Sequence, residues 1–290
     1  MTIQVYYDDW PEYELLDSGH RKKLERFGKY RVIREETKAW WRPELPEQEW
    51  EKAIASHHGE DPGKWEFHRA APQEWRLQFE QLTLEARFTA TSKHVGVFPE
   101  QTAHWRWIAD QIRHAGQREI HVLNLFAYTG IATLIAAAHG ASVTHVDSAK
   151  GVVAWGKRNQ QLSGLDDRPI RWIVDDASKF VQREVRRQRQ YDAILMDPPS
   201  FGRGPKRELW KIEQHLTDLL ADCRQLLSPE PLFVLLTMYS LDQSALLIAN
   251  LLQDMLRGYG GAIEVGELAL KPTSSEKALS MSIFGRWSSG

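Results

Sequence analysis

Cysteine is almost absent from the sequence, since Cys223 is the only one among 290 residues. An internal disulfide and a metal site built from several thiolates are therefore excluded, and no metal is expected. No run of apolar residues approaches 18, so a membrane-spanning helix is not expected either. The first ten residues lack the basic and apolar segments of a signal peptide, and we expect a cytoplasmic protein.

The sequence also lacks an excess of positive charge. It contains 37 Lys and Arg residues against 39 Asp and Glu residues, which gives a net charge of −2. A protein that binds nucleic acid through its overall charge is therefore excluded. Any nucleic-acid surface must be a local patch.

Tryptophan, by contrast, is abundant, and eight of the twelve tryptophans precede residue 108. In this part of the chain, residues 82–90 alternate between apolar and polar, which predicts a half-buried strand, and residues 30–34 predict a weaker one. A helix is expected at about residues 47–56. We interpret residues 1–105 as a β-rich accessory domain on the substrate side. The tryptophans are interpreted as anchors of a small core, with base-stacking platforms as the alternative.

From residue 120 the pattern changes to short apolar runs that alternate with helical segments. Such runs are typical of a parallel sheet covered by helices on both faces. The segment 106–290 is therefore predicted to be an α/β domain with a Rossmann-like, seven-stranded sheet. Its strands are expected near residues 120–125, 142–146, 170–174, 192–196, 232–237, 263–270 and 279–286, with helices near 131–138, 155–162, 208–227 and 244–259.

Ligands of such sheets bind beyond the carboxyl ends of the strands, so the residues that follow each strand are candidate site residues. After the first strand, Gly130 can let the backbone approach a ligand, although a turn glycine is an equal alternative. The segment does not read GxGxxG, so a dinucleotide site is poorly supported. After the second strand, Asp147 can accept hydrogen bonds from both hydroxyls of a ribose. After the third strand, Asp176 can accept from an adenine amino group, or it can cap the following helix.

The fourth strand ends in Asp197-Pro198-Pro199-Ser200-Phe201. Two prolines in a row fix two φ angles and remove two N–H donors, which makes a rigid, extended corner. This pattern indicates a functional role, because a rigid corner holds the Asp197 side chain and the carbonyl oxygens of the corner in place. A planar substrate could lie against it and stack on Phe201.

At these residues the chain resembles the class I S-adenosylmethionine-dependent methyltransferases, and within them the RlmI/RlmK-type ribosomal RNA methyltransferases. The resemblance covers roughly residues 82–240 and includes no RNA-binding PUA-type module. It implies S-adenosylmethionine as cofactor and Asp197, Pro198 and Pro199 as catalytic residues, of which Asp197 and Pro199 would face the transferred methyl group and the substrate. The cofactor-binding residues that it implies are Phe98, Gln101, Asn124, Phe126, Tyr128, Thr129, Gly130, Asp147, Ser148, Asn159, Asp176, Ala177 and Asp197.

The sequence departs from this branch in one respect. Its cytosine-5 methyltransferases carry a nucleophilic cysteine after the fifth strand, whereas residues 237–241 here contain none. Cys223 falls on the apolar face of a predicted helix and is interpreted as a core residue. We therefore expect direct transfer to a nucleophilic nitrogen or oxygen atom, with Asp197 orienting that atom or accepting its proton.

Positive residues follow the Asp-Pro-Pro corner closely, on a segment expected to be a flexible loop. They would give the mouth of the site a positive rim suited to phosphates. RNA, and ribosomal RNA first, is therefore the expected substrate, with a small-molecule or protein methyltransferase and a non-catalytic cofactor-binding module as alternatives. The predicted substrate-binding residues are Ser200, Phe201, Arg203, Lys206 and Tyr239, and the rim also includes Arg207 and Lys211. A second basic cluster at residues 183–189 is interpreted as a solvated helix face.

Overall fold

A computed structural model describes residues 3–290 except residues 8, 60–62, 91, 207 and 240–242. The chain divides into two compact units, which we call unit 1 (residues 1–6, 104–268 and 282–290) and unit 2 (residues 7–103 and 269–281). The sequence suggested two continuous domains that meet at residue 105. In the structure each unit also takes in a segment from the other end of the chain. The first strand pairs within the large sheet of unit 1, and residues 269–281 belong to unit 2.

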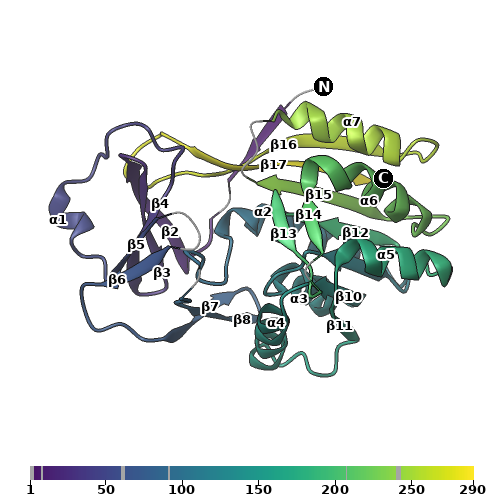
Figure 1. Ribbon diagram of the computed structural model, residues 1–290, viewed down its shortest axis with the longest axis horizontal. Helices are drawn as coiled ribbons and strands as arrows, with labels where there is room; N and C mark the ends of the chain where they lie inside the picture. Colours follow the sequence, from purple (N-terminus) through teal and green to yellow (C-terminus); the bar gives the residue numbers. More distant parts are fainter. Residues whose placement is uncertain (1–2, 8, 60–62, 91, 207, 240–242) are drawn as a thin grey trace. The chain divides into compact units, whose positions relative to one another are not determined.

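Unit 1 contains a large, mostly parallel sheet (Figure 1). This arrangement confirms the expected Rossmann-like α/β fold. The sheet has eight strands rather than seven, because β1 pairs in parallel with β16, while β17 runs antiparallel to β15. In spatial order the strands are β1 (Ile3–Tyr6), β16 (Ala262–Leu270), β17 (Leu279–Ser288), β15 (Phe233–Tyr239), β12 (Ala193–Met196), β9 (His121–Leu125), β10 (Ser142–Asp147) and β11 (Ile170–Val174).

Helices pack against this sheet, and apolar residues of the strands and of the helices together form its core. The sequence interpretation missed α2, whose residues Trp105, Ile108 and Ile112 are buried at helical spacing. None of the described helices is long and apolar enough to span a membrane. The helices are α2 (Thr102–His114), α3 (Ile131–Ala138), α4 (Lys150–Leu162), α5 (Ala177–Arg186), α6 (Ile212–Gln225) and α7 (Ala245–Met255).

Unit 2 is rich in β-structure, as its sequence predicted. A five-stranded sheet is accompanied by the separate hairpin β7–β8. The strand expected at residues 30–34 is confirmed, and the one expected at 82–90 extends over 82–87. The helix expected at 47–56 is shorter and consists of α1 (Glu47–Trp50). The sheet contains β2 (Tyr13–Gly19), β3 (Lys22–Phe27), β4 (Tyr30–Glu35), β5 (Ala55–His58) and β6 (Lys64–Phe67), and the hairpin contains β7 (Glu74–Phe79) and β8 (Leu82–Arg87).

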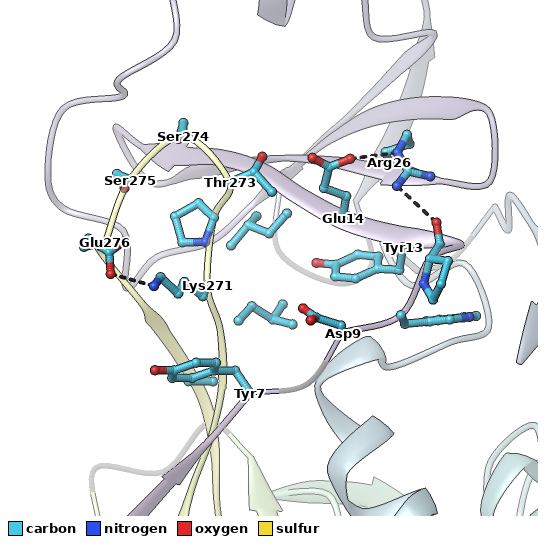
Figure 2. Close-up of a pocket in the computed structure, with 16 residues that line it drawn as sticks. Tyr7, Asp9, Tyr13, Glu14, Arg26, Lys271, Thr273, Ser274, Ser275 and Glu276 are labelled. Carbon is cyan, nitrogen blue, oxygen red and sulfur yellow. Dashed lines mark hydrogen bonds and ion pairs between the residues drawn. The ribbon is translucent and has the colours of Figure 1, made fainter.

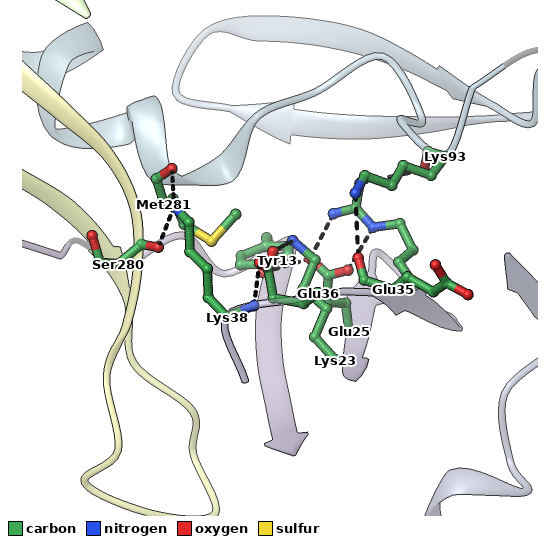
Figure 3. A network of polar contacts seen from close by, with 10 residues as sticks. Tyr13, Lys23, Glu25, Glu35, Glu36, Lys38, Lys93, Ser280 and Met281 are labelled. Carbon is green, nitrogen blue, oxygen red and sulfur yellow. Dashed lines mark hydrogen bonds and ion pairs between the residues drawn. The ribbon is translucent and has the colours of Figure 1, made fainter. Parts of the chain in front are cut away.

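Unit 2 contains a buried ionic cluster (Figure 3). Arg34 donates from Nε and Nη2 to the two carboxylate oxygens of Glu25, each over 2.6 Å, and the Tyr13 hydroxyl donates to the same carboxylate over 2.8 Å. Burial alone would raise the pKa of Glu25, but Arg34 and Lys23 outweigh it, so the pKa is lowered. The hydrogen bonds and the opposite charges of Glu25 and Arg34 therefore offset the cost of burying both groups. Loss of one partner would leave the other buried and unpaired.

Candidate functional site

The carboxyl ends of the central strands of unit 1 meet at one edge of the sheet. Leu125 at the end of β9 is in register with Val146 on β10 and with Met196 on β12, and Asp147 is in register with Val174 on β11. The segments predicted to carry the site follow directly after these positions. The structure thus brings the first loop, the acidic residues and the Asp-Pro-Pro corner to the same edge, where the fold places ligands.

The loop after β9 has an unusual backbone. Phe126 and Tyr128 adopt left-handed φ angles of 54° and 50°, and Gly130 follows at 79°. Left-handed residues other than glycine cost about 1–2 kcal/mol each and persist only where the surroundings hold them. Here the Gly130 N–H donates to the Ala127 carbonyl (3.0 Å), and the Tyr128 N–H donates to the Asp147 carboxylate (2.9 Å). The loop is therefore fixed in shape before any ligand binds.

Asp147 ties this loop to the end of β10. Its Oδ2 accepts from the Tyr128 N–H and its Oδ1 accepts from the Ala149 N–H, both over 2.9 Å. Removal from water raises the pKa of Asp147, and the backbone N–H groups of Ala149, Tyr128 and Ser148 oppose that rise. A carboxylate has about four lone-pair positions, so these contacts leave room for a ribose hydroxyl. The residue fits the role predicted for it, and Ser148 lies beside it, half-buried.

Two buried asparagines make hydrogen bonds next to the first loop. Asn159 is buried and donates to the Thr129 carbonyl over 3.1 Å. Asn124 is also buried and donates to the Thr133 hydroxyl over 2.9 Å. Asn159 thus holds the loop itself, whereas Asn124 ties β9 to α3, and direct contact of either with the cofactor stays a prediction.

The loop after β11 carries both carboxylates expected there. The Asp176 carboxylate caps α5 by accepting from the Lys179 N–H (2.9 Å), which is the alternative role that the sequence allowed. A cap occupies one lone pair, so it does not conflict with an adenine contact. Asp175 binds Arg183, and Ala177 is buried at the start of the helix.

The Asp-Pro-Pro corner follows β12 at the same edge. Asp197 and Pro198 are partly and fully buried, whereas Pro199 and Ser200 are exposed. The segment after the corner is not the flexible loop expected from the sequence. It forms the antiparallel hairpin β13 (Phe201–Arg203) and β14 (Leu209–Lys211), and α6 begins at residue 212 rather than 208.

Trp210 is a site residue that the sequence interpretation missed. Its indole N–H donates to the Pro199 carbonyl over 2.7 Å, and its ring contacts Phe126 with centroids 4.9 Å apart. The side chain is buried, with 4% of its surface exposed. One residue therefore connects the rigid corner to the left-handed loop. The sequence offers no clear signal for this residue, because Leu209 and Trp210 are adjacent apolar residues and do not alternate with polar ones.

The hairpin presents its other face to solvent. Phe201 is in register with Lys211, and Arg203 is in register with Leu209, so these four side chains lie on one face. All four are exposed. Lys206 is exposed at the tip, and Arg207 lies outside the described residues. An aromatic ring, an aliphatic side chain and two cations thus lie directly beyond the Asp-Pro-Pro corner.

The remaining predicted residues have separate positions. Tyr239 is half-buried at the end of β15, and its substrate contact stays a prediction. Phe98 and Gln101 belong to unit 2, where the Phe98 ring lies 4.6 Å from that of His94, and their cofactor role also stays a prediction. Cys223 is fully buried in α6, and burial raises the pKa of its thiol well above the usual value. Within the described part of the chain, no group of His, Cys, Asp and Glu residues could hold a metal ion.

Comparison with known proteins agrees with this geometry. Residues 66–238 match the family of S-adenosylmethionine-dependent methyltransferases. The crystal structure of a SAM-dependent methyltransferase from Agrobacterium tumefaciens is similar over 100% of this chain and 94% of that one, with 43% identity and a TM-score of 0.94. The chain therefore belongs to the S-adenosylmethionine-dependent methyltransferases, and it is an enzyme that uses this cofactor.

Two further comparisons extend this result. The ribosomal RNA large subunit methyltransferase K/L of Vibrio cholerae is 38% identical over 110 residues, which are 37% of this chain but only 15% of that protein. A methyltransferase structure that contains SAH has the same fold over 95% of this chain and 75% of its own, with a TM-score of 0.74 at 16% identity. The chain thus spans a small part of the length of the K/L relative.

Proposed function

We propose that this enzyme methylates RNA, ribosomal RNA first, by direct transfer to a nitrogen or oxygen atom. The observation that carries the proposal is the exposed face of the β13–β14 hairpin, where Phe201 and Leu209 lie beside Arg203 and Lys211. A ring for a base and cations for phosphates are thus placed directly beyond the Asp-Pro-Pro corner. The similarity to a methyltransferase named for ribosomal RNA supports the same substrate.

The residues at the strand ends suit the parts of the cofactor. We assign Asp147 to the ribose and Asp176 to the adenine amino group, because both carboxylates keep lone pairs beyond their protein contacts. The first loop, through Phe126, Tyr128 and Thr129, is assigned to the amino-acid end. Its left-handed backbone holds these residues in place without rearrangement.

S-adenosylmethionine, when bound, supplies an electrophilic methyl carbon whose bond to sulfur breaks with the electron pair remaining on sulfur. The lone pair of the RNA nucleophile forms the new bond to that carbon, and its proton leaves. We assign Asp197 to orienting the nucleophile and accepting that proton. Pro198 and Pro199 hold the corner rigid, so most of the rate arises from positioning.

A thiol intermediate is not part of this proposal. Cytosine-5 transfer needs a thiolate that can reach the base, but Cys223 is fully buried in the helical core with a raised pKa. Residues 237–241 contain no cysteine. A nucleophilic nitrogen or oxygen atom needs no such activation.

Unit 2 is proposed as an accessory module on the substrate side. A ribosomal RNA substrate would place the enzyme in the cytoplasm.

Substrate class can be tested with S-adenosylmethionine labelled in its methyl group. The enzyme is incubated separately with total RNA, with protein extract and with small metabolites, and we expect label in RNA alone. Digestion of labelled RNA to nucleosides and mass spectrometry then identifies the methylated atom. Incorporation only into metabolites or protein would overturn the proposal, and a methyl group on carbon 5 of cytosine would overturn the direct mechanism.

A further inference from the structure

A groove of about 780 Å³ lies on unit 2, lined by residues of β6 and by the segments that enter and leave the β7–β8 hairpin. It is formed by residues of unit 2 alone. Its size is within the range of small-ligand sites, which measure roughly 300–1,000 Å³. None of the residues assigned to the methyl-transfer site lines it.

Three aromatic residues line this groove, namely Trp65, Phe67 and Phe88, and Trp75 packs against Phe88 without lining it. Phe88 is central to them, with ring centroids 4.8 Å from Trp65, 5.0 Å from Phe67 and 5.1 Å from Trp75. Alternation along β6 places Trp65 and Phe67 on one face, whereas Glu66 on the other face contacts His58 of β5 over 3.2 Å. Lys64, the first residue of β6, also lines the groove. Phe67 keeps 52% of its surface exposed. A large exposed ring backed by a rigid cluster is suited to stacking on a planar ligand.

Cations dominate the rim. Lys64, Arg69 and Arg87 line the groove together with one carboxylate, that of Glu74. Arg69 donates to the backbone carbonyl of Glu51 over 3.1 Å, which positions its guanidinium without neutralising it. Arg87 also lies 3.8 Å from the carboxylate of Glu85, which does not line the groove. Even with that pair counted as neutral, the lining keeps a net positive charge, which favours an anionic ligand in a protein whose net charge is −2.

A second cavity of unit 2, of about 890 Å³, makes a useful contrast (Figure 2). There the cations are already paired, since Arg26 binds Glu14 over 2.9 Å and Lys271 binds Glu276 over 2.5 Å. A further carboxylate, Asp9, also lines it. That cavity carries a net negative charge and is poorly suited to an anion. The combination of exposed ring and excess cations distinguishes the first groove.

We propose that the groove around Phe67 binds a single-stranded segment of RNA, with one base stacked on Phe67 and the flanking phosphates against Lys64 and Arg69. Single strands can offer unstacked bases to aromatic side chains, whereas the bases of a duplex are stacked on one another. The inference rests on RNA being the substrate. In it, unit 2 holds an RNA segment separate from the nucleotide that is methylated.

The proposal is tested by fluorescence anisotropy with a fluorescein-labelled, 12-nucleotide oligoadenylate RNA and the full chain. Phe67→Ala removes the exposed ring and is expected to raise the Kd between about 5-fold and 150-fold, the range for loss of one base–aromatic stack. A double variant, Lys64→Glu with Arg69→Glu, is expected to weaken binding and to reduce its dependence on salt. The second variant keeps the test valid if the first one folds poorly.

Matched controls come from the same unit. Trp40 is the more exposed aromatic residue, at 79%, and lies outside the groove, so Trp40→Ala should leave the Kd unchanged. Lys22→Glu serves as the control for charge, because Lys22 is exposed on β3 and does not line the groove. A 12-base-pair RNA duplex tests for stacking, since Phe67→Ala should leave duplex affinity unchanged.

Wild-type affinity for the oligonucleotide in both groove variants would overturn the proposal. Equal losses for single-stranded and duplex RNA on Phe67→Ala would also overturn it, because they would indicate a general effect on charge or folding. The labelled-methyl assay separates this inference from the proposed function. If the groove variants methylate RNA with an unchanged KM, RNA binding by the groove would be refuted while the proposed function would stand. Oligonucleotide binding that depends on Phe67, without any methylation of RNA, would refute the substrate assignment alone.

Discussion

Trp210 offers a direct test of how the rigid corner is held. Trp210→Phe keeps an aromatic ring beside Phe126 but removes the N–H that donates to the Pro199 carbonyl over 2.7 Å. Because Pro199 is exposed, water can replace the lost donor, so the loss in the free energy of unfolding should stay near 1 kcal/mol. That corresponds to a decrease in Tm of about 2–4 °C for a unit of this size.

The effect on catalysis should be larger than the effect on stability. Without the indole N–H, the Asp-Pro-Pro corner loses the bond that fixes its last proline carbonyl, although the Ile212 N–H still binds the Ser200 carbonyl over 3.0 Å. Displacement of a reacting group by about 1 Å can cost 100-fold in rate. We therefore expect kcat for methyl transfer to fall between about 10-fold and 100-fold, with S-adenosylmethionine affinity nearly unchanged.

Trp287 provides a matched control for this substitution. Its indole N–H also donates to a backbone carbonyl, that of Gly260, over 2.9 Å, and its side chain is equally buried. It is in register with Val234 near the start of β15, away from the carboxyl edge of the sheet. Trp287→Phe should lower the Tm by a similar amount without changing kcat. If both variants lost stability and neither lost kcat, the positioning role of Trp210 would be wrong.

Asp197→Ala should abolish transfer while S-adenosylmethionine affinity stays within about tenfold, or 1.4 kcal/mol, in calorimetry; equal loss of both would place Asp197 on the cofactor. Asp147→Ala should act in reverse and lose cofactor binding first. Cys223→Ala should leave the transfer rate of the folded enzyme unchanged, and a rate below 1% of wild type would restore a thiol mechanism. Burial lowers the pKa of His145 to about 3, and burial, with Arg286, does the same for His104. The unfolded chain therefore binds more protons between pH 3 and 6.5, so stability should fall with decreasing pH in this range, by up to about 1.4 kcal/mol per pH unit for each histidine. For His104→Phe, the free energy of unfolding from denaturation curves should change less steeply with pH. An unchanged pH dependence would refute the lowered pKa of His104.

The central sheet could be predicted from the sequence because each of its strands is marked by its own short run of apolar residues. A parallel strand covered on both faces is mostly apolar along its length, as Ala193-Ile194-Leu195-Met196 shows. The edge strand β1 could not be predicted in the same way. Its pairing with β16 joins residues more than 250 positions apart, as in Ile3 with Val265. Such a pairing depends on the complete fold rather than on a local pattern.

The same distinction holds for the candidate site, where some features are marked by single residues and others depend on the complete fold. The acids and the paired prolines were recognisable because their chemistry is carried by single residues at strand ends. The left-handed angles of Phe126 and Tyr128 were not, because neither residue type favours them and only surrounding contacts hold them. One of those contacts is the Asp147 carboxylate, which accepts from the Tyr128 N–H.

Asp147 therefore combines two roles that a sequence pattern cannot separate. The same carboxylate that is assigned to the ribose also fixes the loop assigned to the amino-acid end. Asp147→Asn, which keeps one carbonyl oxygen but loses the charge, separates them. If the amide keeps its oxygen toward the Tyr128 N–H, the loop should remain folded while the bidentate ribose contact is lost. Cofactor affinity should then fall less in Asp147→Asn than in Asp147→Ala, and equal losses would mean that the loop contact contributes nothing to binding.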